Sequence, residues 1–102
     1  MLEQATTVEM VRYTLKEGIA SATGEEARKN LNAFIQKHPG FLHRVTSVDN
    51  EGVYLDLVFW KSLKEAQAAS ELALKTPEVA QQFAVIDESS MLFGHSAVFN
   101  YC

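Results

Sequence analysis

Apolar residues recur along this chain with two periods, one of two residues and one of about 3.6, which are typical of strands and helices respectively. Two segments carry an apolar stripe on one face of a helix, 23–37 and 62–75, and a short helix follows Pro77. Extended runs, alternating or apolar throughout, occupy 7–16, 41–48, 53–60 and 91–101. The pattern predicts the order βαββαβ, with a small helical insertion before the last strand.

The predicted helices carry recognisable start and stop signals. Thr23 to Glu26 and Ser62 to Glu65 both have the sequence of a capping box, in which a hydroxyl caps a free amide at the start of a helix. His38-Pro39-Gly40 ends the first helix, because the residue before a proline is pushed out of the helical region. Pro77 suits the first position of the short helix, where its missing N–H costs nothing.

The two middle strands are separated by Asp49-Asn50-Glu51-Gly52, whose residue types favour a β-hairpin. If Val48 faces Val53 across this loop, alternation decides which side chains share a face. The face of interest then contains Phe41, His43, Val45, Ser47, Tyr54, Asp56, Val58 and Trp60. This set depends on the register, because a slip of one residue moves every side chain of a strand to the other face.

The element order indicates an α+β fold of the ferredoxin-like class, with a four-stranded antiparallel sheet and both main helices on one face. We expect a single domain over residues 1–102, with its core at about 7–101. The strand 53–60 is apolar on both sides, so the face without helices also needs a cover. The simplest cover for so short a chain is a second copy, which predicts a homodimer.

Composition narrows the classes of partner. The chain has 102 residues and a formal net charge of −4, and its Lys and Arg residues are scattered, so no basic stripe favours nucleic acid. No apolar run approaches the roughly 20 residues that span a membrane, and the N-terminus lacks the features of a signal peptide. Cys102 stands alone, so no internal disulfide is possible. We therefore expect a cytoplasmic protein.

Candidate chemistry is limited to one predicted face. The chain has no glycine-rich phosphate loop, CxxC, HExxH or nucleophile elbow, and its three histidines lack ligand spacing, so we expect no metal site. His43 and Asp56 share the face with Tyr54 and Trp60, and a carboxylate beside an imidazole makes a general base. The alternative is a satisfied polar pair in or near the dimer interface. His95 is interpreted as a core or rim residue.

The segment VFWKSLKEAQAASELALKTPEV is similar to the antibiotic biosynthesis monooxygenase family of the dimeric α/β-barrel superfamily. The resemblance covers roughly residues 8–99. Its loose motif consists of an apolar strand ending in Trp60, the helix start from Ser62 to Glu65, Thr76-Pro77 and the inward Phe83. The resemblance implies a ferredoxin-like protomer, a homodimer and a pocket between helices and sheet in each subunit.

The same resemblance implies an activity: cofactor-independent oxygenation of phenolic or quinol-type rings, quinol oxidation or, in one branch, haem degradation. The haem-degrading branch relies on an Asn, a Trp and a His, of which only Trp60 is present here, since Val11 and Ser70 stand near the other two places. We do not expect haem degradation.

Our hypothesis is a monooxygenase or quinol oxidase that acts on a small hydroquinone-like aromatic without cofactor. His43 and Asp56 would form its base, with Trp60, Tyr54 and Tyr13 as substrate-binding walls. The alternative is a non-catalytic small-ligand-binding or regulatory protein with the same dimeric fold. A third interpretation is a purely structural protein with a dry core.

Overall fold

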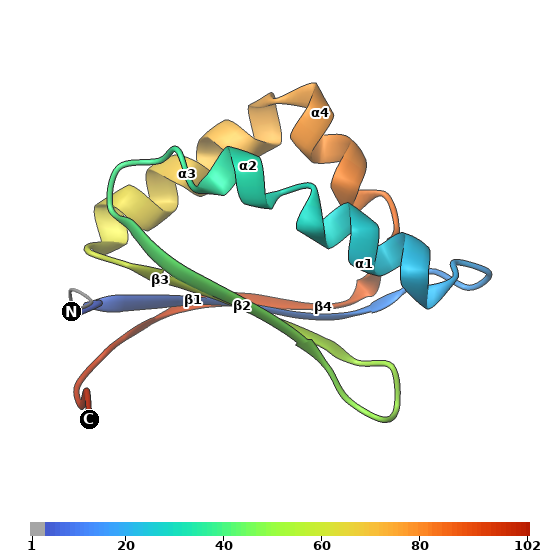
Figure 1. Ribbon diagram of the computed structural model, residues 1–102, viewed down its shortest axis with the longest axis horizontal. Coiled ribbons are helices and arrows are strands. Elements are labelled where there is room, and N and C mark those ends of the chain that lie inside the picture. The colour runs from blue at the N-terminus through green and yellow to red at the C-terminus, as the bar shows by residue number, and fades with distance from the viewer. Residues whose placement is uncertain (1–3) are drawn as a thin grey trace.

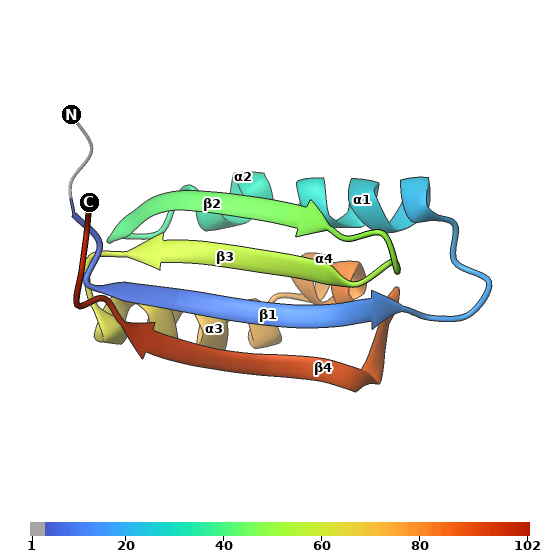
Figure 2. The same ribbon diagram turned by 90° about the horizontal axis from the view of Figure 1, so that it is seen from below.

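A computed structural model describes residues 4–102 as one four-stranded antiparallel sheet with every helix of that range on the same side (Figure 1). The elements are β1 (Thr7–Leu15), α1 (Ser21–Lys29), α2 (Asn32–Ile35), β2 (Phe41–Val48), β3 (Tyr54–Trp60), α3 (Leu63–Lys75), α4 (Pro77–Ala80), the 3-10 turn η1 (Gln81–Phe83) and β4 (Ile86–Ala97). The strands lie in the order β2-β3-β1-β4 (Figure 2). The predicted ferredoxin-like βαββαβ arrangement is confirmed.

Helix α3 starts where the capping signal predicts. Ser62 stands at the N-cap, and its hydroxyl oxygen accepts a hydrogen bond from the backbone N–H of Glu65 at 3.2 Å. Helix α4 likewise begins at Pro77, as expected. Both helix starts are predicted correctly, because the residue at the helix start and the apolar stripe that follows it indicate the same boundary.

The first helix differs from its prediction in two ways. Helix α1 begins at Ser21 after Ala20, which makes no side-chain capping bond, so the expected cap at Thr23 is wrong. The helix predicted over 23–37 is also divided into α1 and α2. At the division, Nη1 of Arg44 donates to the carbonyl oxygen of Arg28 at 3.0 Å and to Oδ1 of Asn32 at 2.7 Å. A residue distant in sequence therefore stabilises the break.

Strand β4 begins earlier and ends earlier than the alternation suggests. Asp87–Ser90, which lies outside the expected strand 91–101, belongs to β4, while 98–101 does not. Ile86 pairs with Leu15 and is buried at the start of β4. Near a shift in register, the hydroxyl of Ser90 accepts the backbone N–H of Thr14 at 2.9 Å. The hydrophobic pattern does not mark the start of β4, because this strand lies at the edge of the sheet, where water can reach its polar residues.

The β2–β3 hairpin forms as predicted, but its register does not match. The carboxylate of Asp49 accepts the N–H groups of Glu51 and Val53, and Gly52 adopts a positive φ of 81°. Val48 pairs with Tyr54 instead of Val53, which shifts the strands by one residue. A second irregularity near Leu42 brings Phe41 back opposite Trp60. His43, Val45 and Ser47 consequently lie on the face opposite to that of Asp56.

The two faces of the sheet are covered unequally. The helix-facing side holds the core, in one cluster around Tyr13 and Ile86 and another around Trp60 and Ala66. The other side, which we call the open face, has no helix over it (Figure 1). Its central strand presents half-buried Leu55, Leu57 and Phe59, and towards the edges Val45 and Leu92 are exposed.

Candidate functional site

The helix-facing side of the sheet contains buried ionisable groups among its apolar residues. Alternation places Glu9 and Tyr13 of β1 on this side, next to Asp56 of β3. Arg28 comes down onto them from α1 and is only 3% exposed. Burying a charge is costly unless it is paired and hydrogen-bonded. Each of these buried groups therefore requires partners that compensate for the loss of water.

Asp56 is held by two arginines. Arg44 on β2 donates through Nε to Oδ1 at 2.9 Å and through Nη2 to Oδ2 at 2.6 Å, and Nη2 of Arg28 donates to Oδ2 at 2.8 Å. The hydroxyl of Thr46, at 3.3 Å from Oδ1, donates the fourth bond. The bonds of Arg44 to the carbonyl of Arg28 and to Asn32 extend the network to α1 and α2.

This network makes Asp56 a fixed negative charge. Burial by itself would raise the pKa of Asp56, but the hydrogen bonds and positive charges of Arg44 and Arg28 outweigh it and hold that pKa below its usual value. A guanidinium does not give up its proton in a protein. Asp56 thus joins β3 to β2 and α1, and it has neither a free lone pair nor a titratable partner for proton transfer.

The predicted pairing of His43 with Asp56 is wrong. His43 pairs with Phe59 in the register of β2 and β3, and its ring stands 6.0 Å from the Phe59 ring on the open face. Thr46 is the residue of β2 that pairs with Asp56, and its side chain shares the face of Asp56. The physical reason is the one-residue shift at the hairpin, since every side chain of β2 beyond the irregularity near Leu42 changes face.

A second polar cluster brings together Glu9, Ser70 and His95. Glu9 and His95 are directly paired residues of β1 and β4, and Nε2 of His95 lies 3.1 Å from Oε1 of Glu9. The hydroxyl of Ser70, on α3 above them, lies 3.1 Å from the same oxygen and 3.2 Å from the carbonyl oxygen of Ala66. The His95 side chain keeps 16% exposure, and its ring meets that of Phe93 edge-on at 5.2 Å.

This cluster has the composition of an acid–base pair. A carboxylate that binds one ring nitrogen of a histidine orients the ring and leaves the other nitrogen to act on a ligand, an arrangement that general bases use. Ser70 binds Glu9 from α3 and fixes the carboxylate relative to that helix. Unlike the network around Asp56, this cluster contains an imidazole, a group that can both accept and donate a proton.

The three aromatic residues expected as walls also lie on the helix-facing side. The rings of Tyr13 and Tyr54 stack with centroids 5.4 Å apart and planes 8° from parallel. Trp60 is completely buried, packs edge-on against Phe41 at 6.0 Å and contacts the cluster of Ala66. Among the described residues, the indole Nε1 of Trp60 and the hydroxyl of Tyr13 have no hydrogen-bond partner.

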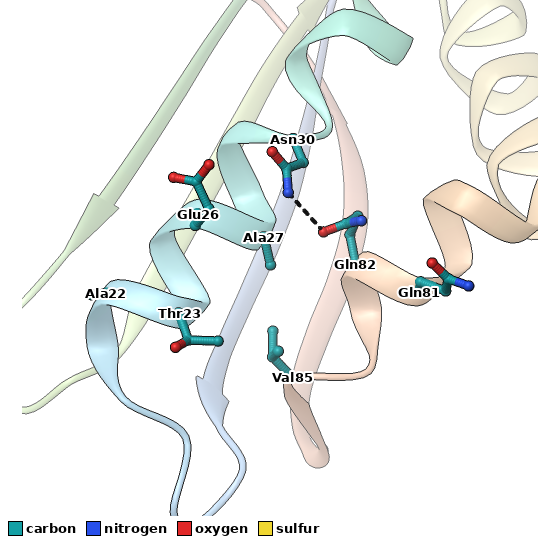
Figure 3. A pocket seen from close by; sticks show the side chains of 8 residues that line it. All are labelled: Ala22, Thr23, Glu26, Ala27, Asn30, Gln81, Gln82 and Val85. Carbon is teal, nitrogen blue, oxygen red and sulfur yellow. Dashed lines mark hydrogen bonds between the residues drawn. The ribbon is translucent and has the colours of Figure 1, made fainter.

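An open groove of about 460 Å³ lies between α1 and η1 (Figure 3). It is lined by Ala22, Thr23, Glu26, Ala27, Asn30, Gln81, Gln82 and Val85. The amide of Asn30 donates to Oε1 of Gln82 at 3.3 Å, and this bond spans the two walls of the groove (Figure 3). Val85 also packs against the cluster around Tyr13, so the groove lies next to the aromatic part of the core.

Sequence reasoning had no means of finding the Glu9 cluster. His95 and Glu9 are 86 positions apart, and Ser70 is 61 positions from Glu9. The one available signal was the placement of polar residues at inward positions of otherwise apolar strands. Arg44 was similarly hidden, because the assumed register placed it on the other face.

Within residues 4–102, no three His, Cys, Asp or Glu side chains gather closely enough to hold a metal ion. None of the helices in that range is long and apolar enough to cross a membrane.

Comparison with solved structures shows the fold: the chain is similar to structures described as a cofactor-independent oxygenase, a putative antibiotic biosynthesis monooxygenase and a dimeric ferredoxin-like protein. SnoaB, a cofactor-independent oxygenase from Streptomyces nogalater, is 20% identical over 96% of each chain, with a TM-score of 0.65. The ActVA-Orf6 monooxygenase of Streptomyces coelicolor, solved with nanaomycin D, is 12% identical over 96% of this chain and 91% of its own, with a TM-score of 0.72.

A dimeric ferredoxin-like protein from an uncultured marine organism is 12% identical over 97% of this chain and 92% of its own, again with a TM-score of 0.72. No family model matches the sequence, and no curated protein does either. At these identities the likeness establishes the fold, and the activity has to be argued from the site.

Proposed function

We propose that the protein is a homodimeric monooxygenase or quinol oxidase that acts on a small hydroquinone-like aromatic without a metal or flavin. The observation that carries this proposal is the hydrogen bond between His95 and Glu9 on the helix-facing side of the sheet. Val58, opposite Glu9 on β3, packs in the same cluster as Trp60, so the base stands beside an apolar aromatic wall. The structural neighbours described as oxygenases support the same chemistry.

In this proposal His95 takes the proton of a phenolic hydroxyl, and Glu9 stabilises the imidazolium that forms. The phenolate then gives one electron to O2, and the two radicals combine at a ring carbon that carries hydrogen. Loss of water from the hydroperoxide leaves a quinone, so one phenol and one O2 become one quinone and one H2O. With a hydroquinone, transfer of two electrons and two protons yields the quinone and H2O2 instead.

The walls of the reaction space are Trp60, Tyr54 and Tyr13, which face the helices together with the base. All three are buried, so the substrate reaches them only when the structure opens. The unpartnered Nε1–H of Trp60 offers a donor to a ring oxygen in such a complex.

The homodimer is supported by the open face. Leu55, Leu57 and Phe59 form an apolar strip that no helix of residues 4–102 covers, and related structures are described as dimeric. A second copy packed on this face would bury the strip. Sedimentation at micromolar concentration checks this, and a monomer contradicts it.

The decisive experiment compares two histidines on opposite faces. Purified protein is incubated with a panel of quinols and phenols while oxygen uptake is followed. We expect His95→Gln to lower the rate by about 100- to 10,000-fold, the usual contribution of a general base. The same substitution at His43, on the open face, should leave the rate unchanged. The proposal fails if no compound is turned over above buffer, or if His43→Gln costs as much as His95→Gln.

A non-catalytic ligand-binding role is the second candidate, and the groove between α1 and η1 favours it. The groove is open, and none of its lining residues is a histidine or a cysteine. A compound that raises the melting temperature without being consumed, and whose binding does not depend on His95, would support this role.

A further inference from the structure

Arg28 is buried between the helices and the sheet with hydrogen-bonding capacity to spare. Its guanidinium carbon lies 5.1 Å from the ring centre of Tyr13 and 5.2 Å from that of Phe83. Nη2 binds Asp56, but within residues 4–102 neither Nε nor Nη1 has a partner. Buried donors without an acceptor lower the stability of a protein, and native structures rarely keep them without a reason.

The hydroxyl of Tyr13 has the same property at the same place. The side chain is 1% exposed, and the described part of the chain offers its hydroxyl no partner. Burial raises the pKa of Tyr13 to about 12, with the charge of Arg28 acting in the opposite direction. At neutral pH the group is therefore an O–H donor within the field of the guanidinium.

The formal charge of the buried cluster around Asp56 is also not balanced. Among residues 4–102, the ion pairs of this buried cluster join Arg28 and Arg44 to the one carboxylate of Asp56, so its formal charge is +1. A guanidinium stays ionised in a protein. One further negative charge beside the unpaired donors of Arg28 would neutralise the cluster and satisfy those donors together.

The groove between α1 and η1 provides a way in. Ala27 and Gln82, which line it, are the sequence neighbours of Arg28 and Phe83, and Val85 packs against the Tyr13 cluster. A hydrogen bond between the side-chain amides of Asn30 and Gln82 crosses the groove (Figure 3). Opening this hydrogen bond would let η1 move away from α1, the helix that carries Arg28.

We propose that Arg28 and Tyr13 form an anion-recognition point that binds the carboxylate of an aromatic acid, which enters through the groove between α1 and η1. The inference rests on the proposed function in one respect, because it assigns an ionised carboxylate to the aromatic substrate. Arg28 and the Tyr13 hydroxyl donate to the carboxylate, and the rings of Tyr13 and Phe83 surround the charged group.

The test uses two probes of nearly the same shape, the anion 4-hydroxybenzoate and the neutral 4-hydroxybenzamide, with binding measured by calorimetry at pH 7. We expect the acid to bind at least tenfold more tightly than the amide. Tyr13→Phe should weaken binding of the acid about tenfold, the usual worth of a hydrogen bond to a charged group, and leave that of the amide unchanged. Without ligand the variant should melt at the same or a higher temperature, because an unpartnered buried hydroxyl has been removed.

Tyr101→Phe, at an exposed position, is the matched control and should change nothing. Arg28→Lys keeps a positive charge beside Asp56 and removes the spare guanidinium donors, so it should also abolish the preference for the acid. Equal binding of both probes, binding of neither, or an unchanged affinity of Tyr13→Phe for the acid would overturn the inference. Acid-selective binding without oxygen uptake would sustain it and refute the oxygenase, and the two proposals can therefore fail separately.

Discussion

Asp56 and Glu9 are buried carboxylates on neighbouring strands of the same sheet face, and they differ in the groups that donate to them. Asp56 accepts from the guanidinium groups of Arg44 and Arg28, neither of which releases its proton. Glu9 is bound by an imidazole and a hydroxyl, those of His95 and Ser70. Burial alone therefore does not identify a functional carboxylate, because the partner determines whether a proton can move.

The positions of Asp56 and Glu9 in the sheet explain why their partners differ. Asp56 lies on β3, inside the sheet, under α1, and joins segments that are distant in sequence. Glu9 pairs with a residue of the edge strand β4, so His95 keeps contact with solvent. A closed ionic cluster suits fixing the fold, whereas a partly open one suits exchanging protons with a ligand.

The largest effect that would distinguish the two carboxylates is on stability. Asp56→Asn leaves two buried guanidinium groups without a counter-charge and should lower the free energy of unfolding by about 3–5 kcal/mol. Urea denaturation of the variant and the wild type measures this difference in the free energy of unfolding. Glu71→Gln, at an exposed position of α3, should stay within about 0.5 kcal/mol of the wild type. A loss below about 1 kcal/mol for Asp56→Asn would show that the cluster is not a structural anchor.

Tyr13 differs from both carboxylates, because its buried hydroxyl has no hydrogen-bond partner among the described residues. Its pKa, about 12 when folded, exceeds the ordinary tyrosine value of 10.0 because burial disfavours the phenolate. The protein should thus keep its full stability below pH 10 and lose about 3 kcal/mol as the pH rises to 12. Denaturation between pH 8 and 12 tests this. Tyr13→Phe should reduce that alkaline slope, and an identical slope in the variant would contradict the assignment.

The smallest effect concerns the third member of the Glu9 cluster. Ser70→Ala removes one donor to Glu9 from α3 and should change stability by about 1 kcal/mol or less, since alanine favours the helix. Oxygen uptake should fall less than tenfold, because His95 still binds Glu9. Ser62→Ala, at the N-cap of the same helix, should lower stability by about 0.5–2 kcal/mol and leave the rate intact. A larger loss of rate in Ser70→Ala than in His95→Gln would reverse their roles.

Much of the fold could be predicted because its signals are local. Ser62 caps α3, Pro77 opens α4, and Asp49 with Gly52 forms the turn, and in each case a few adjacent residues contain the necessary chemistry. The misplaced start of α1 and the early start of β4 lie where local signals were ambiguous.

The site could not be predicted, because it depends on the register. The apolar residues of β3 identify a buried strand without specifying which residue of β2 faces Asp56. A shift of one position at Val48 was enough to place Thr46 opposite Asp56, to move His43 to the open face and to bring Arg44 onto the helix-facing side. Trp60, Tyr54 and Tyr13 were placed correctly on that side because β3 and β1 alternate without interruption along their paired length.

By itself, the sequence determined the order of the elements, the class of fold and the need to cover a second apolar face, since periodicity and capping act between residues close together in the chain. Only the tertiary structure decided which charges meet. Glu9 with His95, and Arg28 with Tyr13 and Asp56, are brought together by strand pairing and by the packing of α1 and α3 on the sheet. Hydrogen bonds and ion pairs act over a few ångströms, and a distance in sequence does not encode such a separation.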